Sequence, residues 1–266
     1  MEASQSVPFR GQFLSGTAIK IAGCILMTAD HLHQMFPGLM PAWLGWFGRP
    51  VAAMFLFLCA EGFSHTRSRK RYMLQFLGGF LFMAVMNMVL SAAMPMEQTA
   101  LINNIFGTLF MAVYYMWMVD RFRRGVTEKR PALAVSAAGG MLLPGVISLA
   151  MLLVMQSGSR AAVIFLFIPS LLSVEGGFVL VFMGALFYLL RKYRLAQAAL
   201  VLAAAALSWY MLRDGSGRVQ GLMAFAVIPI LLYNGKRGPG GKYFFYIFYP
   251  AHIYLLYAAA WFLRFI

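Results

Sequence analysis

Nine apolar stretches, each long enough to cross a lipid bilayer, constrain the fold of this chain more than any other feature of its sequence. A membrane-spanning helix needs about 20 predominantly apolar residues, and about 17 are tolerated. Because 62% of the residues are hydrophobic and only 11% are charged, a soluble fold could not bury the apolar surface. We therefore expect an all-α, polytopic membrane helix bundle that forms one membrane-embedded domain over residues 1–266. The stretches are 18–36, 48–64, 72–94, 102–120, 132–156, 174–190, 195–212, 219–234 and 244–262.

A tenth apolar segment, residues 161–172, is too short to be counted with the others. It runs into Pro169 and then into the Ser-Val-Glu-Gly-Gly sequence that contains Glu175. Irregular backbone at membrane depth is tolerated where protein or water covers it. We therefore expect a re-entrant or interfacial half-helix, and if the segment does cross, the bundle has ten spans.

Four clusters of basic residues set the expected topology. Short cytoplasmic loops collect Lys and Arg, and placing all four clusters inside requires an even number of crossings between consecutive clusters. The N-terminus is then cytoplasmic, and its polar first residues do not read as a signal peptide. The net charge of +14 is explained by this topology, so we expect no nucleic-acid partner. Alternatively, some clusters bind the phosphates of an anionic substrate. The clusters are Arg67/Arg69/Lys70/Arg71, Arg121/Arg123/Arg124/Lys129/Arg130, Arg191/Lys192/Arg194 and Lys236/Arg237/Lys242.

The first apolar stretch carries Asp30, His31 and His33 near its far end. Each ionisable group at the centre of a bilayer costs about 2.5 kcal/mol or more on insertion scales, so three within four residues require an explanation. One interpretation is an intramembrane acid–base site, since imidazole titrates near neutrality and can take and return a proton. The other is that the helix ends early and leaves the group in water.

Helical geometry separates these side chains. At about 100° per residue, Lys20 and His31 return to nearly the same face, about 16 Å apart along the helix. Asp30 points about 100° away from His31 but shares a face with His33. Two hypotheses follow: His31 is the reactive base with its partner on another helix, or an Asp30–His33 pair is the working unit. The partners to test for His31 are Arg49, Glu61 and His252.

Other polar residues of the apolar stretches are candidates with a structural alternative beside each. Arg49 could form an ion pair with Asp30. Glu61 could be a solvated carboxylate that offsets the charge of the basic cluster that follows it. Asn104, with Asn103, could cap a helix. Glu175 could line a cavity. The last stretch has Tyr249 and His252 on either side of Pro250, which removes a helix hydrogen bond. We expect no structural disulfide or zinc site, because Cys24 and Cys59 both lie in apolar stretches.

Several blocks of this sequence resemble the TraX family of bacterial membrane proteins. They are Lys20 with TADH (28–31), GRPVAAMFLFLCAEGFSHTRSRKRY (48–72), NNIFGTLF (103–110) and, most specifically, LLYNGKRG (231–238) with KYFFYIFYPAH (242–252). The blocks extend from the first apolar stretch to the last, so the resemblance covers essentially the whole chain. TraX proteins are associated with N-terminal acetylation of conjugative pilin and are grouped with integral-membrane acyltransferases that use acyl-CoA.

This resemblance implies a bacterial inner-membrane acetyltransferase that takes its acyl group from cytoplasmic acetyl-CoA. The acceptor would be an amine or hydroxyl of a peptide or glycan at or beyond the outer face. His31 would be the general base, together with Asp30. Lys20, which stands where many members of the broader class have Arg, would bind the substrate by meeting the CoA phosphates. Arg49, Glu61, Asn104, Glu175, Tyr249 and His252 would line the substrate path, and Arg67, Arg69, Lys70, Arg71, Lys236, Arg237 and Lys242 would meet the CoA phosphates.

Two other classes of function fit the same residues. A proton-coupled transporter or channel could use the polar track from Glu61 through His252 to Asp30 and His31. A non-catalytic assembly partner of a conjugation or secretion complex would need none of this chemistry. The sequence identifies neither the acceptor nor the oligomeric state.

Overall fold

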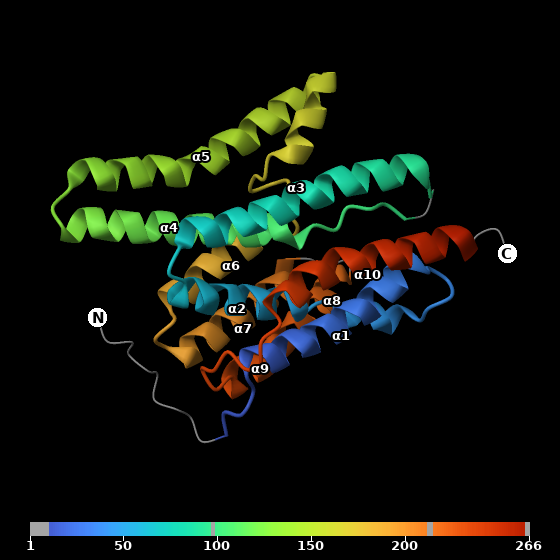
Figure 1. The fold of residues 1–266 in the computed structure, drawn as a ribbon, viewed down its shortest axis with the longest axis horizontal. Coiled ribbons are helices and arrows are strands. Elements are labelled where there is room, and N and C mark those ends of the chain that lie inside the picture. The colour runs from blue at the N-terminus through green and yellow to red at the C-terminus, as the bar shows by residue number, and fades with distance from the viewer. Residues whose placement is uncertain (1–10, 97–98, 212–214, 264–266) are drawn as a thin grey trace. The chain divides into compact units, whose positions relative to one another are not determined.

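The computed structural model describes residues 11–96, 99–211 and 215–263, and all the regular structure in these ranges is helical. The prediction of an all-α chain is thus confirmed. This part of the chain forms ten α-helices and three 3₁₀ segments. The α-helices are labelled in Figure 1. The α-helices are α1 (Gly16–Met35), α2 (Val51–His65), α3 (Arg69–Ala93), α4 (Ile105–Thr127), α5 (Pro131–Gln156), α6 (Gly177–Leu189), α7 (Arg194–Met211), α8 (Ser216–Gly221), α9 (Val227–Leu232) and α10 (Lys242–Leu263); the 3₁₀ segments are η1 (Ala42–Trp46), η2 (Arg160–Phe167) and η3 (Leu222–Ala226).

Each predicted apolar stretch has folded as helix, and the chain is a multi-pass membrane protein. Within the described residues, five helices are long and apolar enough to cross a bilayer: η1 with α2, α3, α5, α7 and α10. In the same described ranges, the other predicted stretches do not form a single helix that is both long enough and apolar enough to be counted as a span. For example, α1 carries Lys20 and Asp30, and α6 has only 13 residues. The figure of nine crossings therefore stays a prediction.

Two apolar segments are less regular than a continuous spanning helix. Residues 219–234 divide into α8, η3 and α9, and Pro229 in α9 has no N–H to donate. The expected half-helix at 161–172 forms η2, a 3₁₀ helix of eight residues. At about 2.0 Å of rise per residue, η2 is far too short to cross a hydrocarbon core of about 30 Å.

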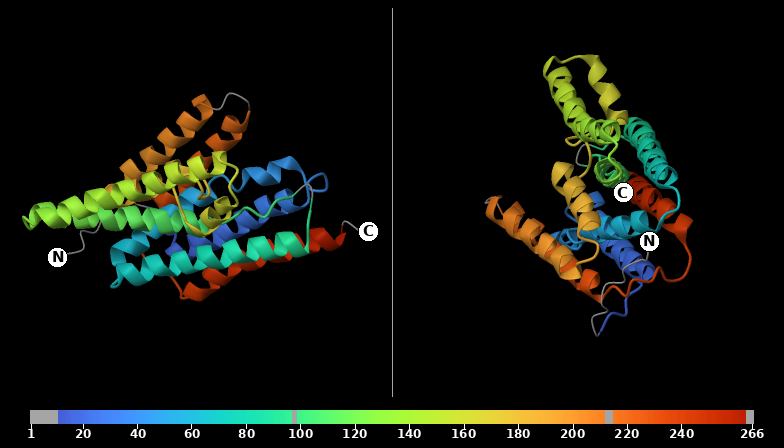
Figure 2. Two further views of the ribbon diagram at one scale, coloured as in Figure 1. Left: turned by 90° about the horizontal axis from the view of Figure 1, so that it is seen from above. Right: turned by 90° about the vertical axis from the view of Figure 1, so that its left-hand side faces the viewer.

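The described residues group into two compact units. Unit 1 draws on Met1–Leu58, Asn87–Ile102 and Leu190–Ile266, and unit 2 on Cys59–Met86 and Asn103–Leu189. In unit 1, α1 packs against η1 and α10, and α7 packs against α8, η3 and α9. In unit 2, α4 packs along both α5 and α6, and the two views of Figure 2 agree with Figure 1 that α4 and α5 lie side by side.

Tyrosine hydroxyls explain how α5 tolerates a proline in its interior. Pro144 cannot donate to the carbonyl of Gly140, four residues earlier. The hydroxyl of Tyr114, on α4, donates to that carbonyl at 2.7 Å, and its neighbour Tyr115 donates to the carbonyl of Met141 at 3.0 Å. These bonds satisfy backbone groups that a bilayer could not, and they join α4 to α5 in unit 2.

In unit 1, a basic loop closes over the beginning of α1. The first backbone N–H groups of a helix have no partner inside it. Ser15 accepts from the N–H of Ala18, and the N–H groups of Gly16 and Thr17 donate at 2.9 Å to the carbonyls of Lys236 and Arg237. The hydroxyl of Thr17 also lies 2.7 Å from the carbonyl of Pro239. The start of α1 is thereby fixed beside the residues that lead into α10.

Candidate functional site

Two buried histidines of unit 1 form the centre of the candidate site. His31 of α1 is 4% exposed and His252 of α10 is 7% exposed. Nδ1 of His31 lies 2.8 Å from Nε2 of His252, with the ring centroids 5.0 Å apart and 18° between the ring planes. Of the three predicted partners for His31, the structure therefore selects His252.

The backbone of α10 determines the tautomers of this pair. Nδ1 of His252 lies 2.8 Å from the carbonyl oxygen of Phe248, and only a protonated nitrogen can donate to a carbonyl. A neutral His252 then has its lone pair on Nε2 and accepts the Nδ1–H of His31. By this assignment from the hydrogen-bond network, Nε2 of His31 carries the lone pair of a base.

Aromatic rings of α10 hold His252 in place. The ring of Phe248 stacks on the imidazole at 4.8 Å between centroids, with 12° between the planes. The buried ring of Tyr249 meets the same imidazole edge-on at 5.8 Å. The structure therefore gives Tyr249 a packing contact with the histidine pair, and its role in substrate binding stays a prediction.

Asp30 belongs to a different cluster from the histidine pair. Nη2 of Arg49 lies 3.3 Å from Oδ1 of Asp30, and Nη1 lies 3.4 Å from Oε1 of Gln220 in α8. Nε of Arg49 donates to the carbonyl of Gly45 at 3.3 Å. The sequence left open whether Asp30 pairs with His33 or with Arg49, and the structure shows the ion pair with Arg49. This ion pair joins α1 to the segment before α2. A catalytic role for Asp30 stays a prediction.

Close approach of backbone to α1 explains two glycines in this cluster. A Cβ atom on Gly48 would overlap the carboxylate of Asp30, and a Cβ on Gly45 would lie 3.0 Å from the ring of His33. Nδ1 of His33 is itself 3.2 Å from the carbonyl of Met40. The ring of His33 is thus bonded to the loop after α1, and the structure records no hydrogen bond between His33 and Asp30.

Lys20 lies at the other end of α1. Its Nζ is 5.2 Å from the centroid of the Phe245 ring in α10, a distance at which a cation is attracted to the face of the ring. Lys236 and Arg237 are exposed in the loop clamped to the start of α1. The side chain of Lys242, a predicted CoA contact, lies outside the described part of the structure. Unit 1 therefore brings together Lys20 and the loop of Lys236 and Arg237.

The remaining predicted residues belong to unit 2. Glu61 is half-buried on α2, and its carbonyl lies 2.8 Å from Nδ1 of His65. Oε2 of Glu175 accepts the backbone N–H of Asn104 at 3.2 Å, directly before α4 begins. A carboxylate at that position satisfies an orphan N–H group and complements the helix dipole. Glu175 therefore caps α4, whereas the side chain of Asn104 makes no capping hydrogen bond and its Nδ2 donates to the carbonyl of Phe80 at 3.0 Å. A substrate role for either residue stays a prediction.

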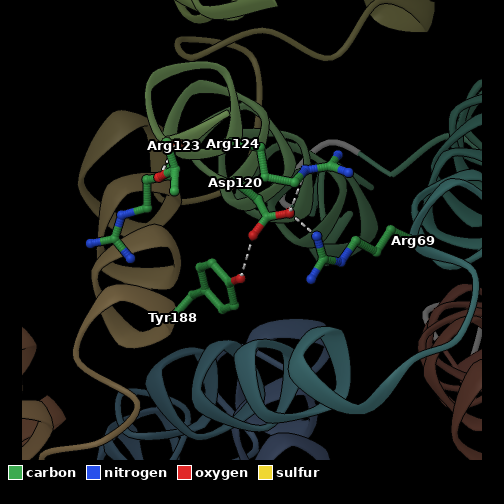
Figure 3. Close-up of polar contacts among 6 residues, drawn as sticks. Arg69, Asp120, Arg123, Arg124 and Tyr188 are labelled. Atoms are coloured by element: carbon green, nitrogen blue, oxygen red, sulfur yellow. Dashed lines mark hydrogen bonds and ion pairs between the residues drawn. The ribbon is translucent and has the colours of Figure 1, made fainter. Parts of the chain in front are cut away.

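The basic cluster after α2 contains one arginine with a defined partner. Arg67, Lys70 and Arg71 are exposed, whereas Arg69 forms an ion pair with Asp120 of α4. Figure 3 shows Asp120 between Arg69, Arg124 and the hydroxyl of Tyr188 from α6, with the side chain of Arg123 directed away. Tyr188 donates to Oδ1 of Asp120 at 3.1 Å, and Nε of Arg124 lies 3.7 Å from Oδ2. This contact gives Arg69 a structural role in joining α3 to α4.

Three residues that take part in the polar clusters described above were not identified from the sequence: Asp120, Tyr188 and Gln220. Asp120 lies four residues before Arg124 on a helix, and this spacing predicts an ion pair. No sequence signal distinguishes Tyr188 or Gln220, because their partners lie on other helices.

We expect Asp120→Asn to destabilise the protein by about 1–3 kcal/mol. The substitution keeps an acceptor for Tyr188 but leaves Arg69 and Arg124 without their carboxylate, and the cost is below that of a fully buried pair because Arg69 is 33% exposed. Denaturant unfolding in detergent micelles measures the change. Glu128→Gln is the matched control, because its pair with Arg130 is open to solvent and we expect a change near zero. Equal effects of the two substitutions would contradict a structural role for Asp120.

The chain is similar in sequence to a known protein family and to a bacterial protein. The family model described as TraX protein matches residues 15–259. The chain is also 27% identical, over 280 residues, to the "Probable fimbrial assembly protein FimC, serogroup H1" of Dichelobacter nodosus, with 94% of this chain and 97% of the relative covered. No solved structure matches the chain. Within the described residues, no group of His, Cys, Asp and Glu side chains is arranged to hold a metal ion.

Proposed function

Because the chain belongs to the TraX family, we propose that it is an integral-membrane acetyltransferase that moves an acetyl group from acetyl-CoA to an amine or hydroxyl. The observation that carries this proposal is the buried His31–His252 pair, in which one imidazole nitrogen has the lone pair of a base. A general base within hydrogen-bond reach of the attacking group contributes about 10²–10⁴-fold to such a reaction.

The residues of the pair have distinct roles in the proposed reaction. Nε2 of His31 takes the proton of the acceptor as its nitrogen or oxygen attacks the thioester carbonyl. The C–S bond then breaks, and the imidazolium returns the proton to the departing CoA sulfur. Throughout, Nε2 of His252 accepts the Nδ1–H of His31, which holds the ring in its reactive tautomer and stabilises its positive charge. The acetyl group is transferred, and the dyad ends as it began.

The proposed location is the bacterial inner membrane, with the N-terminus in the cytoplasm. In this orientation the end of α1 that carries Lys20 faces the cytoplasm, where acetyl-CoA is available. Lys20, Lys236 and Arg237 of unit 1 then meet the CoA phosphates. These three groups are neighbours in unit 1, because the loop of Lys236 and Arg237 is bonded to the start of α1. Arg67, Lys70 and Arg71 belong to unit 2, and their contact with CoA stays a separate prediction.

The proposed acceptor is the N-terminus of a pilin-like peptide. The printed name of the Dichelobacter nodosus relative refers to fimbrial assembly, and the family resemblance implies pilin acetylation. If the acceptor is instead a sugar hydroxyl, the acetyl transfer also needs His31 as the general base.

The name of that relative also favours a second candidate function, a non-catalytic assembly partner of a pilus or conjugation complex.

Comparative mass spectrometry tests the proposed function. Surface peptides and glycans are analysed from cells with and without the chain, and acetyl transfer to the affected molecule is then reconstituted with purified protein in nanodiscs. We expect one surface molecule to lose its acetyl group when the chain is absent, and CoA to be released when acetyl-CoA and that molecule are supplied. Unchanged surface acetylation, together with no binding of CoA, would refute the acetyltransferase and favour an assembly partner or a proton-coupled transporter.

A further inference from the structure

An apolar groove runs between α1 and α10 in unit 1, and one of its wall residues, Phe248, also stacks on His252. Its volume is about 720 Å³. Along α1 its wall extends from Thr17 to Leu32, a length of about 22 Å at a rise of ~1.5 Å per residue. On the opposite side it extends from Gly240, in the loop before α10, to Phe248 in α10. We call this feature the α1–α10 groove.

The walls of the α1–α10 groove suit hydrocarbon. Its two threonine hydroxyls are bonded to backbone, Thr17 to the carbonyls of Arg237 and Pro239 and Thr28 to that of Cys24. The other lining side chains are apolar or absent. A ligand with amide groups, such as the pantetheine arm of CoA, would lose its hydrogen bonds to water here without gaining replacements. An alkyl chain loses none.

The groove is also open along its side. Ile25 is 65% exposed and Phe244 is 54% exposed, although both line it. Helix α10 is one of the segments long and apolar enough to span a bilayer, so we expect this opening to face lipid. A ligand can therefore enter from the membrane itself without passing through water.

One end of the groove is strongly basic. Lys20 lies over Phe245, a wall residue, and the loop of Lys236 and Arg237 is bonded to Thr17. Asp30 is the one acidic residue in residues 11–32 and 231–263, the segments that build the groove; it lies ten residues beyond Lys20 and pairs with Arg49. The positive charge at the Lys20 end therefore attracts an anionic headgroup.

We propose that the α1–α10 groove binds one acyl chain of an anionic phospholipid, with the lipid phosphate at Lys20, Lys236 and Arg237. The hydrocarbon walls, the lateral opening and the basic end each match one part of that ligand. The same basic residues are available to CoA phosphates, but the walls distinguish the two ligands because only a lipid has an alkyl chain of this length to place along them.

Photo-crosslinking tests the lipid site without any acetyl-transfer reaction. The full chain is reconstituted in nanodiscs, in the absence of CoA, with phosphatidylglycerol that carries a diazirine in one acyl chain, and labelled peptides are mapped by mass spectrometry. We expect labelling to concentrate on the groove residues of α1 and α10 rather than on Leu142, an exposed residue of α5. Labelling should exceed that by a phosphatidylcholine analogue about fivefold. Labelling spread evenly over the exposed apolar residues would overturn the proposal.

Matched variants separate the two halves of the site. Ala29→Phe fills the groove and should abolish its labelling, whereas Ala203→Phe on the exposed face of α7 should not. The double variant Lys236→Gln/Arg237→Gln should remove the preference for phosphatidylglycerol while labelling by phosphatidylcholine persists. If Ala29→Phe fails to fold, the wild-type map and the loop variant still decide the proposal. Because the readout is labelling, its failure is distinguishable from failure of acetyl transfer.

Discussion

His31→Ala lowers acetyl transfer about 10²–10⁴-fold, the usual contribution of a general base. The substitution removes Nε2 of His31, the nitrogen that carries the lone pair of the base when the tautomers are assigned from the hydrogen-bond network. Release of CoA thiol, with the acetylated acceptor quantified by mass spectrometry, measures the loss. Because the acceptor must still bind, the decrease should fall on kcat rather than on the KM for acetyl-CoA.

A second histidine provides the control for this experiment. His65→Ala removes an exposed imidazole whose bond is to the carbonyl of Glu61, and we expect turnover to stay within about twofold because the side chain is placed outside the proposed chemistry. The His31→Ala protein must remain folded, which denaturant unfolding checks. Undiminished turnover by a folded His31→Ala protein would eliminate His31 as the base.

His252→Ala reduces kcat by about 10²-fold, because His31 loses the group that holds its tautomer and orientation. His252 is a positioning residue, since it acts on the substrate through His31. His252→Gln should recover part of the lost rate, because its side-chain oxygen can accept the Nδ1–H of His31. The comparison of kcat between the alanine and glutamine variants is the measurement.

Rescue by glutamine separates positioning from general destabilisation. Tyr254→Phe removes another polar contact of α10, the hydrogen bond at 3.0 Å to Oδ1 of Asn87, and we expect it to cost about 0.5–1.5 kcal/mol of stability without changing kcat. If His252→Ala behaved like Tyr254→Phe, with lowered stability and normal turnover, the pair would serve packing alone. Equal activity of the alanine and glutamine variants would likewise refute the positioning role.

Hydrophobicity over long runs was sufficient to predict the elements of this fold. Each apolar stretch had to satisfy its backbone polar groups internally, and in a bilayer a helix is the way to do so within one segment. The exception is local. Residues 219–234, predicted as one stretch, divide into α8, η3 and α9. Hydropathy averages over a window and does not register such breaks.

Helical periodicity also determined half of the candidate site. The turn of about 100° between neighbours excluded His31 and Asp30 from acting as a pair within α1, whatever the rest of the chain did. The same geometry placed Asp30 where an arginine before α2 could reach it, and Arg49 does. These conclusions needed one helix and the short loop after it.

Only the tertiary structure decided which groups from distant segments meet. His31 and His252 are brought together because α1 packs along α10, and Asp120 reaches Arg69 and Tyr188 through the packing of unit 2. Side-chain contacts between helices depend on their order, rotation and relative height in the bundle. The hydrophobic pattern does not predict the order, rotation or height of the helices, because lipid-facing and helix-facing surfaces are both apolar in a bilayer. The sequence by itself therefore determined the helices and the face of α1 that carries the base, and the packing of α10 decided its partner.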